Sequence, residues 1–238
     1  MRTSLAFSLL LAVSGCHFVQ GSGRLQTQTR AFTSFHAVDL RGISDVSLVR
    51  GEGSISVTTD DNLLQYVVVE VKGDTLTVEE RDPATGNATL APTHGIKVQV
   101  SAPDAPTDVS LSGTGSFLWA DPAPLTVETL GLHVDGTGSV EAALAVTTVN
   151  ADLQGTGSVT LTGTCSAGSF QLSGTGGLHA FGLSLRTAKV NVSGTGSAEV
   201  SVADSLDAVI SGTGSVLYRG APTVTSRVSG VGSVRQSN

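Results

Sequence analysis

A four-residue phrase, GTGS or a close variant, occurs seven times from residue 113 onward. The first glycines of the seven phrases are Gly113, Gly136, Gly155, Gly174, Gly194, Gly212 and Gly230. Successive phrases are about 20 residues apart, and the first interval is the longest. A repeat of this length is typical of a solenoid, in which each repeat forms one coil that stacks on the coil before it.

The residues that flank the phrase repeat as well. Two residues before each phrase stands an aliphatic side chain: Leu111, Val134, Leu153, Leu172, Val192, Ile210 and Val228. Four residues after each first glycine stands another apolar residue: Phe117, Val140, Val159, Leu178, Ala198, Val216 and Val234. Only 4% of the residues are aromatic, so the core consists of small and β-branched side chains, which suits thin stacked layers. We therefore predict an all-β chain folded as a parallel β-helix, with two or three short strands in each coil.

The two glycines of each phrase admit two explanations. In an extended chain, Leu111, Gly113, Gly115 and Phe117 point to one side, and the glycines leave room where the opposite wall of a narrow coil comes close. Alternatively, one or both glycines turn a corner at positive φ, which a residue with a Cβ tolerates poorly. Both explanations predict that larger residues at these positions destabilise the fold.

The N-terminus has the features of a secretory signal. Arg2 precedes an apolar run that is too short to span a bilayer as a mature helix. The run ends in VSGC at Cys16, a junction that resembles the bacterial lipobox, in which the cysteine is diacylated and becomes the first residue. We predict a signal peptide over residues 1–15 and a lipid anchor at Cys16, which makes a membrane the first partner. Residues 16–31 are rich in Gly, Gln, Ser and Thr, and we expect a flexible tether there.

Residues 32–107 have the alternation of β-strands and no convincing helical period. Two alternating runs flank Gly73-Asp74 and predict a β-hairpin. The sequence VDLRG over 38–42 looks like a degenerate copy of the later repeat. We therefore predict a single domain over 32–238, with a strand-rich part over 32–107 and seven coils over 108–238.

The repeats carry a resemblance to a known family. The (S/T)-G-(T/S)-G coils close with SGTGSVLY at 211–218, GAP at 220–222 and VSGVGSV at 228–234. This resembles the family called "putative auto-transporter adhesin, head GIN domain" from about Phe32 to Val234. The resemblance implies a right-handed parallel β-helix at a bacterial cell surface, and it brings no known catalytic residues. Many relatives have an Asp after the second glycine, where this chain has Ser in six copies and Gly in one, so an acidic ladder for cations is not expected.

The sequence lacks the residues that several common kinds of functional site require. A phosphate-binding loop needs a following lysine or a helix, and each phrase here is followed by a strand pattern instead. The histidines are far apart in the sequence and fall in different phases of the repeat, so we predict no metal site and no cofactor. Cys165 has no partner for an internal disulfide once Cys16 is lipidated. We therefore expect Cys165 to be a small, buried hydrophobic residue. The formal net charge of −7 comes from scattered acids and argues against nucleic acid as a partner.

Some β-helix proteins are enzymes that act on polysaccharides, with carboxylates gathered in one groove. The candidates here are Asp135 with Glu141, and Glu199 with Asp204 and Asp207. Dispersed, solvated acids explain these residues better, so we predict a protein that is not an enzyme. The polysaccharide-acting enzyme and a purely structural envelope protein without a ligand stay as alternatives.

The sequence therefore predicts a lipid-anchored protein of the bacterial outer membrane that acts as a surface scaffold or adhesin-like module. Stacked coils would arrange the phrase hydroxyls in files, and a repetitive glycan or protein ligand could contact them. The residues of this possible binding face are Thr114, Thr137, Thr156, Thr175, Thr195 and Thr213. The alternative is structural, because Val231 fills the same slot in the last coil and shares the β-branched shape of threonine.

Overall fold

The computed structural model describes residues 18–84, 86 and 88–237, so the predicted signal peptide and Cys16 lie outside the described residues. Its strands are β1 (Phe18–Gln20), β2 (Leu25–Arg30), β3 (Ala37–Gly42), β4 (Asp45–Arg50), β5 (Ser54–Asp60), β6 (Val67–Lys72), β7 (Thr75–Glu80), β8 (Thr89–Ala91), β9 (Lys97–Ala102), β10 (Asp108–Gly113), β11 (Ser116–Trp119), β12 (Thr129–Gly136), β13 (Ser139–Leu153), β14 (Ser158–Leu172), β15 (Gly177–Val192), β16 (Ser197–Ile210), β17 (Ser215–Arg219), β18 (Thr223–Val228) and β19 (Ser233–Gln236). One short 3-10 turn, η1 (Leu64–Tyr66), precedes β6. In this described part of the chain, no helix is long and apolar enough to cross a membrane.

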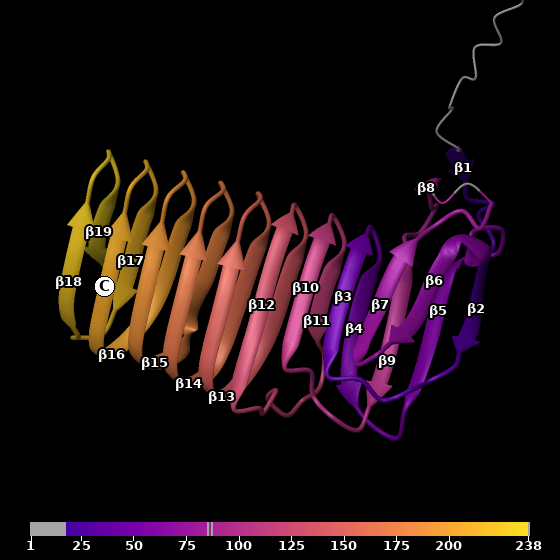
Figure 1. Cartoon of the computed structure of the whole chain (residues 1–238), viewed down its shortest axis with the longest axis horizontal. Coiled ribbons are helices and arrows are strands. Elements are labelled where there is room, and N and C mark those ends of the chain that lie inside the picture. Colours follow the sequence, from indigo (N-terminus) through magenta and orange to yellow (C-terminus); the bar gives the residue numbers. More distant parts are fainter. Residues whose placement is uncertain (1–17, 85, 87, 238) are drawn as a thin grey trace, which may run out of the picture.

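The strands stack into a parallel β-solenoid of about six turns. In Figure 1 the chain rises on the front face, turns at the upper edge and descends on the back face, while it advances from right to left. This combination makes the coil right-handed. The front sheet contains β7, β3, β10, β12, the later halves of β13 to β16, and β18. The back sheet contains β9, β4, β11, the earlier halves of β13 to β16, β17 and β19. The predicted all-β, right-handed parallel β-helix is confirmed.

The core lies between the two sheets, and equivalent residues of successive coils stack in register. Leu111 pairs with Val134, and Val140 pairs with Val159. Twelve of the fourteen apolar positions that flank the phrases are buried, as predicted. The two exceptions, Val228 and Val234, belong to the last coil. They are less buried because no further coil covers them within the described residues.

The first coil in the sequence, β3 with β4, is not the first coil in space. It lies between β7 and β9 on one side and β10 and β11 on the other. The VDLRG segment is a coil of the stack, since Val38 pairs with Val109 and Gly42 with Gly113. The predicted hairpin is also confirmed, because β6 and β7 are antiparallel around Gly73.

Antiparallel strands close the N-terminal end of the solenoid, and we call them the cap: β6 on β7, β5 on β9, and β2 on β5. The expected flexible tether over 16–31 is wrong for residues 18–30, which contain β1 and β2. Strand β1 pairs with β8, and β2 forms the outer edge beyond β5. Strand β2 (LQTQTR) has no buried residue and therefore no hydrophobic alternation. The strand is held in place by its backbone pairing with β5 and by polar contacts of its own side chains, such as Thr27 with Thr58 at 2.7 Å.

Candidate binding surfaces

The turns that contain the phrases form a continuous edge along the top of the solenoid (Figure 1), which we call the ridge. The residues between the two glycines of each phrase are all exposed on the ridge: Thr114, Thr137, Thr156, Thr175, Thr195, Thr213 and Val231. The position of these threonines on an outer surface agrees with the sequence analysis. Their role in binding stays a prediction.

Backbone hydrogen bonds run along the ridge from coil to coil. The N–H of Thr137 donates to the carbonyl oxygen of Gly113 at 2.9 Å, and the N–H of Thr156 donates to Gly136 at 2.8 Å. The same bond recurs at every phrase, up to Val231 and Gly212 at 3.1 Å. These N–H groups and glycine carbonyl oxygens are therefore satisfied internally, and the exposed threonine side chains are available to a ligand.

The glycines are required because neighbouring coils approach closely at the ridge. A Cβ on Gly155 would lie 2.0 Å from the carbonyl oxygen of Gly136, and a Cβ on Gly157 would lie 2.4 Å from that of Gly138. The obstacle is the backbone of the preceding coil, not the opposite wall of the same coil. Positive φ contributes at Gly113 (+142°) and Gly136 (+151°), whereas the later phrase glycines lie outside that region.

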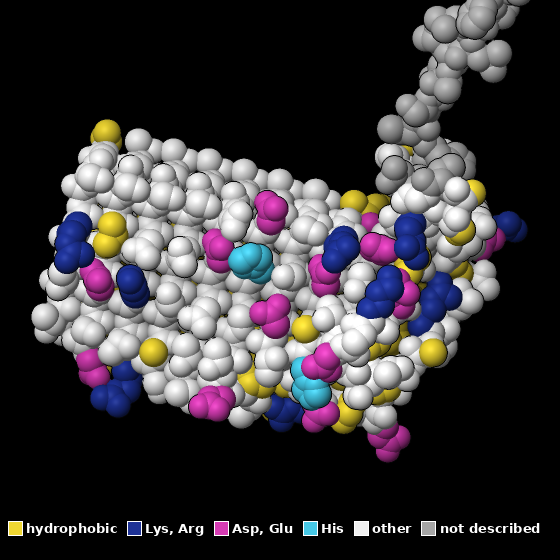
Figure 2. Space-filling model, viewed as in Figure 1, with side chains coloured by type: hydrophobic (Ala, Val, Ile, Leu, Met, Phe, Trp, Pro, Cys, Tyr) yellow, Lys and Arg dark blue, Asp and Glu magenta, His cyan; other side chains and the backbone are white. Residues whose placement is uncertain are grey.

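A shallow groove crosses the outer surface of the front sheet. Its larger hollow, of about 970 Å³, is lined by residues that include Asp108, Glu128, His133, Asn150, Asp152 and Gln171. A second hollow, of about 520 Å³, shares Asp152 and Gln171 and continues past Asn191 to β16. We call the two hollows together the front groove. Figure 2 shows this face, with a histidine among acidic side chains near its centre and with both basic and acidic side chains toward the C-terminal end.

The histidines are separated, and three of them each face one acid. The distances from the histidine Nδ1 to the carboxylate oxygen are 2.8 Å for His36 and Asp74, 3.2 Å for His179 and Glu199, and 3.9 Å for His133 and Asp152. The hydrogen bond and the charge of Asp74 raise the pKa of His36. Among the described residues, no three His, Cys, Asp or Glu side chains gather as metal ligands.

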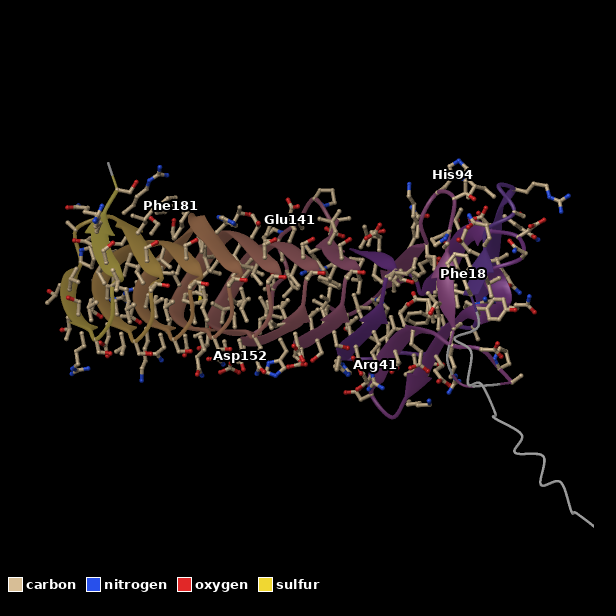
Figure 3. The ribbon with its side chains drawn as sticks, turned by 90° about the horizontal axis from the view of Figure 1, so that it is seen from above. Phe18, Arg41, His94, Glu141, Asp152 and Phe181 are labelled. Atoms are coloured by element: carbon tan, nitrogen blue, oxygen red, sulfur yellow. The ribbon has the colours of Figure 1, made fainter. Side chains whose placement is uncertain are left out.

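The carboxylates considered for an enzyme do not converge. Asp135 projects from the front sheet and Glu141 from the back sheet, and Figure 3 shows Glu141 and Asp152 on opposite sides of the solenoid. The other three acids each face a basic group: Glu199 faces His179, Asp204 faces Arg186 at 3.0 Å, and Asp207 faces Arg227 at 4.0 Å. Two carboxylates flanking one bond, as glycoside hydrolysis requires, are not assembled from these residues.

Cys165 is buried at 4% exposure, which confirms the prediction of a small core residue. Burial raises the pKa of its thiol, and the S–H lies 3.2 Å from the carbonyl oxygen of Ala167 as a hydrogen-bond donor. A buried thiol with a raised pKa is a poor nucleophile. The residue therefore belongs to the packing of the solenoid.

Residues 34–222 match the sequence profile of the family described as "Putative auto-transporter adhesin, head GIN domain". The chain belongs to this family. A search of the curated proteins finds no significant match for this GIN-domain chain.

Solved structures share the fold of this GIN domain. A putative adhesin from Bacteroides fragilis has a TM-score of 0.83 at 23% identity and covers 92% of this chain and 100% of its own. A protein from Parabacteroides distasonis, named as a putative lipid binding protein, has a TM-score of 0.76 at 24% identity and covers 93% of this chain and all of its own. A putative adhesin from Parabacteroides merdae has a TM-score of 0.67 at 23% identity, with 94% and 100% coverage.

Two features of this GIN domain were missed by the sequence analysis. The first is Asp60, which is fully buried in the cap and accepts hydrogen bonds from the N–H groups of Gly23 at 2.6 Å and Thr93 at 2.8 Å. Burial alone would raise the pKa of Asp60, but these backbone donors outweigh it and lower the pKa. The second is the front groove. Its signal was available as polar residues at outward positions of the coils, but these residues follow no repeated motif.

Proposed function

We propose that this GIN-domain protein is a lipid-anchored, non-enzymatic binding module of the bacterial outer membrane. The observation that carries the proposal is the location of the two ends. Strand β1 begins two residues after Cys16 and lies at the capped end, where Figure 3 labels Phe18. A lipid at Cys16 would therefore hold the capped end at the membrane and leave the ridge, both sheets and the far coils available for contact.

An adhesin-like role is supported by the family description and by the names of the similar structures. The ridge supports contact with a repetitive ligand, because equivalent hydroxyls recur once per coil on a backbone that is satisfied internally. Each coil contributes a small share, so the affinity rises with the number of coils engaged. The five acids weighed for catalysis, Asp135, Glu141, Glu199, Asp204 and Asp207, do not converge in one groove, which supports a role in binding rather than in hydrolysis.

The anchor is tested by the change Cys16→Ser. The wild type should fractionate with detergent-extracted membranes, and the variant should move to the soluble envelope fraction. A wild-type protein that is already soluble would rule out the anchor. The binding role is tested separately with the purified Cys16→Ser protein on an array of immobilised polysaccharides and proteins.

The contribution of the ridge is tested by changing Thr137, Thr156 and Thr195 together to Val. Valine keeps the β-branched shape, so folding should be unchanged while three hydroxyls are removed. If ridge hydroxyls make the contact, retention on the surface that the parent binds should fall at least tenfold. Undiminished retention would exclude these hydroxyls as the binding face.

A further inference from the structure

The front groove presents two files of hydrogen-bonding side chains. Asn150 pairs in register with Ser169, and Asp152 pairs with Gln171, which in turn pairs with Asn191. Within a file, neighbouring residues are separated by the strand spacing of about 4.8 Å. Across the files, residues two apart on one strand are about 6.6 Å apart. The groove is therefore a regular grid of polar groups that spans several coils.

The amides of this grid are free to bind a ligand. Within the described part of the chain, no hydrogen bond from the protein satisfies the side-chain amide of Asn150, Gln171 or Asn191. Each amide offers two N–H donors and one carbonyl acceptor. A hydroxyl group both donates and accepts, so adjacent amides on successive coils match a molecule that carries many hydroxyls.

The hollow has a structural origin in two departures from the repeat. The first interval between phrases is the longest, and its extra length forms the segment before β12, which places Glu128 at the margin of the groove. Gly131 then leaves a gap in the file between Asp108 and Asn150. A Cβ at Gly131 would lie 2.3 Å from an oxygen of Asp108, so the glycine leaves room for that carboxylate at the margin of the groove.

The charges of the larger hollow disfavour an anionic ligand. Asp108, Glu128 and Asp152 line the larger hollow, and His133 is 3.9 Å from Asp152. Like charges repel, so a chain that carries carboxylates or sulfates would be disfavoured there. The lining contains no Phe, Tyr or Trp, so binding would depend on hydrogen bonds from several coils rather than on stacking of a sugar against a large aromatic face.

We propose that the front groove binds a neutral polysaccharide whose chain runs along the solenoid axis. One pyranose unit is similar in length to the spacing of the coils, so successive sugars would meet Asn150, Gln171 and Asn191 in turn. This inference rests on the proposed binding role and gives it a ligand class. It also places the contact on the front sheet, apart from the ridge.

The test uses the purified Cys16→Ser protein and neutral polysaccharides: dextran, mannan, xylan and laminarin, with alginate as the anionic comparison. Affinity electrophoresis should show retardation by at least one neutral polymer and none by alginate. Oligosaccharides of that polymer should bind more tightly as they lengthen, up to the span of the groove.

The variant N150A/Q171A/N191A removes the three free amides and should weaken this binding at least tenfold. The matched control T164A/S184A/S201A removes three hydroxyls that share one file on the back sheet and should stay within twofold of the parent. Equal melting temperatures would establish that both variants are folded. If the groove variant has an altered melting temperature, the single change Gln171→Ala replaces it and should weaken binding at least threefold.

Two outcomes would overturn the proposal that the front groove binds a polysaccharide, while leaving the proposed function intact. One is retention by a protein surface and by no neutral polysaccharide. The other is glycan binding that survives N150A/Q171A/N191A and is lost in the ridge variant T137V/T156V/T195V. Absence of binding to any surface on the array would overturn both proposals together.

Discussion

The cap and the repeated coils solve the same problem, the closure of a stack of strands, in different ways. Between phrases, the coils are held by backbone hydrogen bonds and by buried side chains in register, and any one coil resembles the next. The cap adds single, specific contacts to its antiparallel strand pairing. Asp60 binds the N–H groups of Gly23 and Thr93, and the guanidinium of Arg30 donates to the carbonyl oxygen of Leu64 at 2.9 Å. Regularity thus stabilises the middle, and particular polar residues stabilise the end.

The largest effect is expected from Gly157→Val in a central coil. The new Cβ would lie 2.4 Å from the carbonyl oxygen of Gly138 and 2.8 Å from a methyl group of Val134, so the backbone must shift. We expect a loss of about 3 kcal/mol or more in the free energy of unfolding. Chemical denaturation measures it, with Thr156→Val as the control, because that neighbour is exposed and should change stability by less than about 0.5 kcal/mol. Equal losses would mean that close stacking of the ridge is not what requires glycine.

A smaller effect should distinguish the middle of the solenoid from its open end. Val192 and Val228 occupy the same position two residues before a phrase, but their exposures are 1% and 43%. Val192→Ala should cost about 2 kcal/mol, because it removes two buried methyl groups and leaves a cavity. Val228→Ala should cost less than about 1 kcal/mol, because that side chain is partly in water. Similar costs in paired denaturation experiments would show that something covers the last coil in solution.

A local effect is expected from Asp60→Asn in the cap, because asparagine keeps one acceptor oxygen and turns an NH2 group toward the other backbone donor. Hydrogen exchange should show faster exchange at the amides of Gly23 and Thr93, while amides of β14 and β15 stay protected. Unchanged protection at both amides would mean that Asp60 does not hold the segment. Gln65→Glu, a change of charge at an exposed cap residue, is the control.

The same residue predicts a dependence on pH. The pKa of Asp60 is lower in the folded protein than its ordinary value, so the folded state favours the charged carboxylate. Its contribution is fully present above the ordinary pKa of aspartate and is lost as the pH falls through the lowered value. Wild-type protection of the Gly23 amide should therefore decline in acid, and the variant should show a weaker decline. A parallel decline in both proteins would assign the acid sensitivity to other groups.

The repeated coils were predictable because each of them has the same sequence pattern of apolar residues around its phrase. Leu153, Leu172 and Val192 stand two residues before their phrases, and each is buried as expected. The cap was not predictable in this way. Strand β2 has no buried face, and its partner β5 comes only after β3 and β4 in the sequence, so local alternation carries no signal for the pair.

The two candidate sites differ in the same way: the ridge could be predicted from the repeat, and the front groove could not. The threonines of the ridge could be placed from the phrase alone, because a repeated position has one environment. Gln171 and Asn191 share one position in the repeat, but Asn150 stands two residues further from its phrase, so the three come together only through the register of the coils. The long first interval between phrases was visible in the sequence, but the groove beside it required the position of Glu128 in space.

The place of β3 and β4 inside the stack has a consequence for how the chain folds as it emerges, N-terminus first, from a ribosome or a secretion channel. Their neighbours are β7 and β9 on one side and β10 and β11 on the other, and all four follow later in the sequence. The first coil to emerge therefore stays uncovered on at least one side until β11 has followed, and closing these long loops is the slow step. Every coil after that emerges beside a finished template and can add to it at once. Each coil can thus fold as it emerges only from β12 onward. The N-terminal half is the part that a chaperone would have to protect.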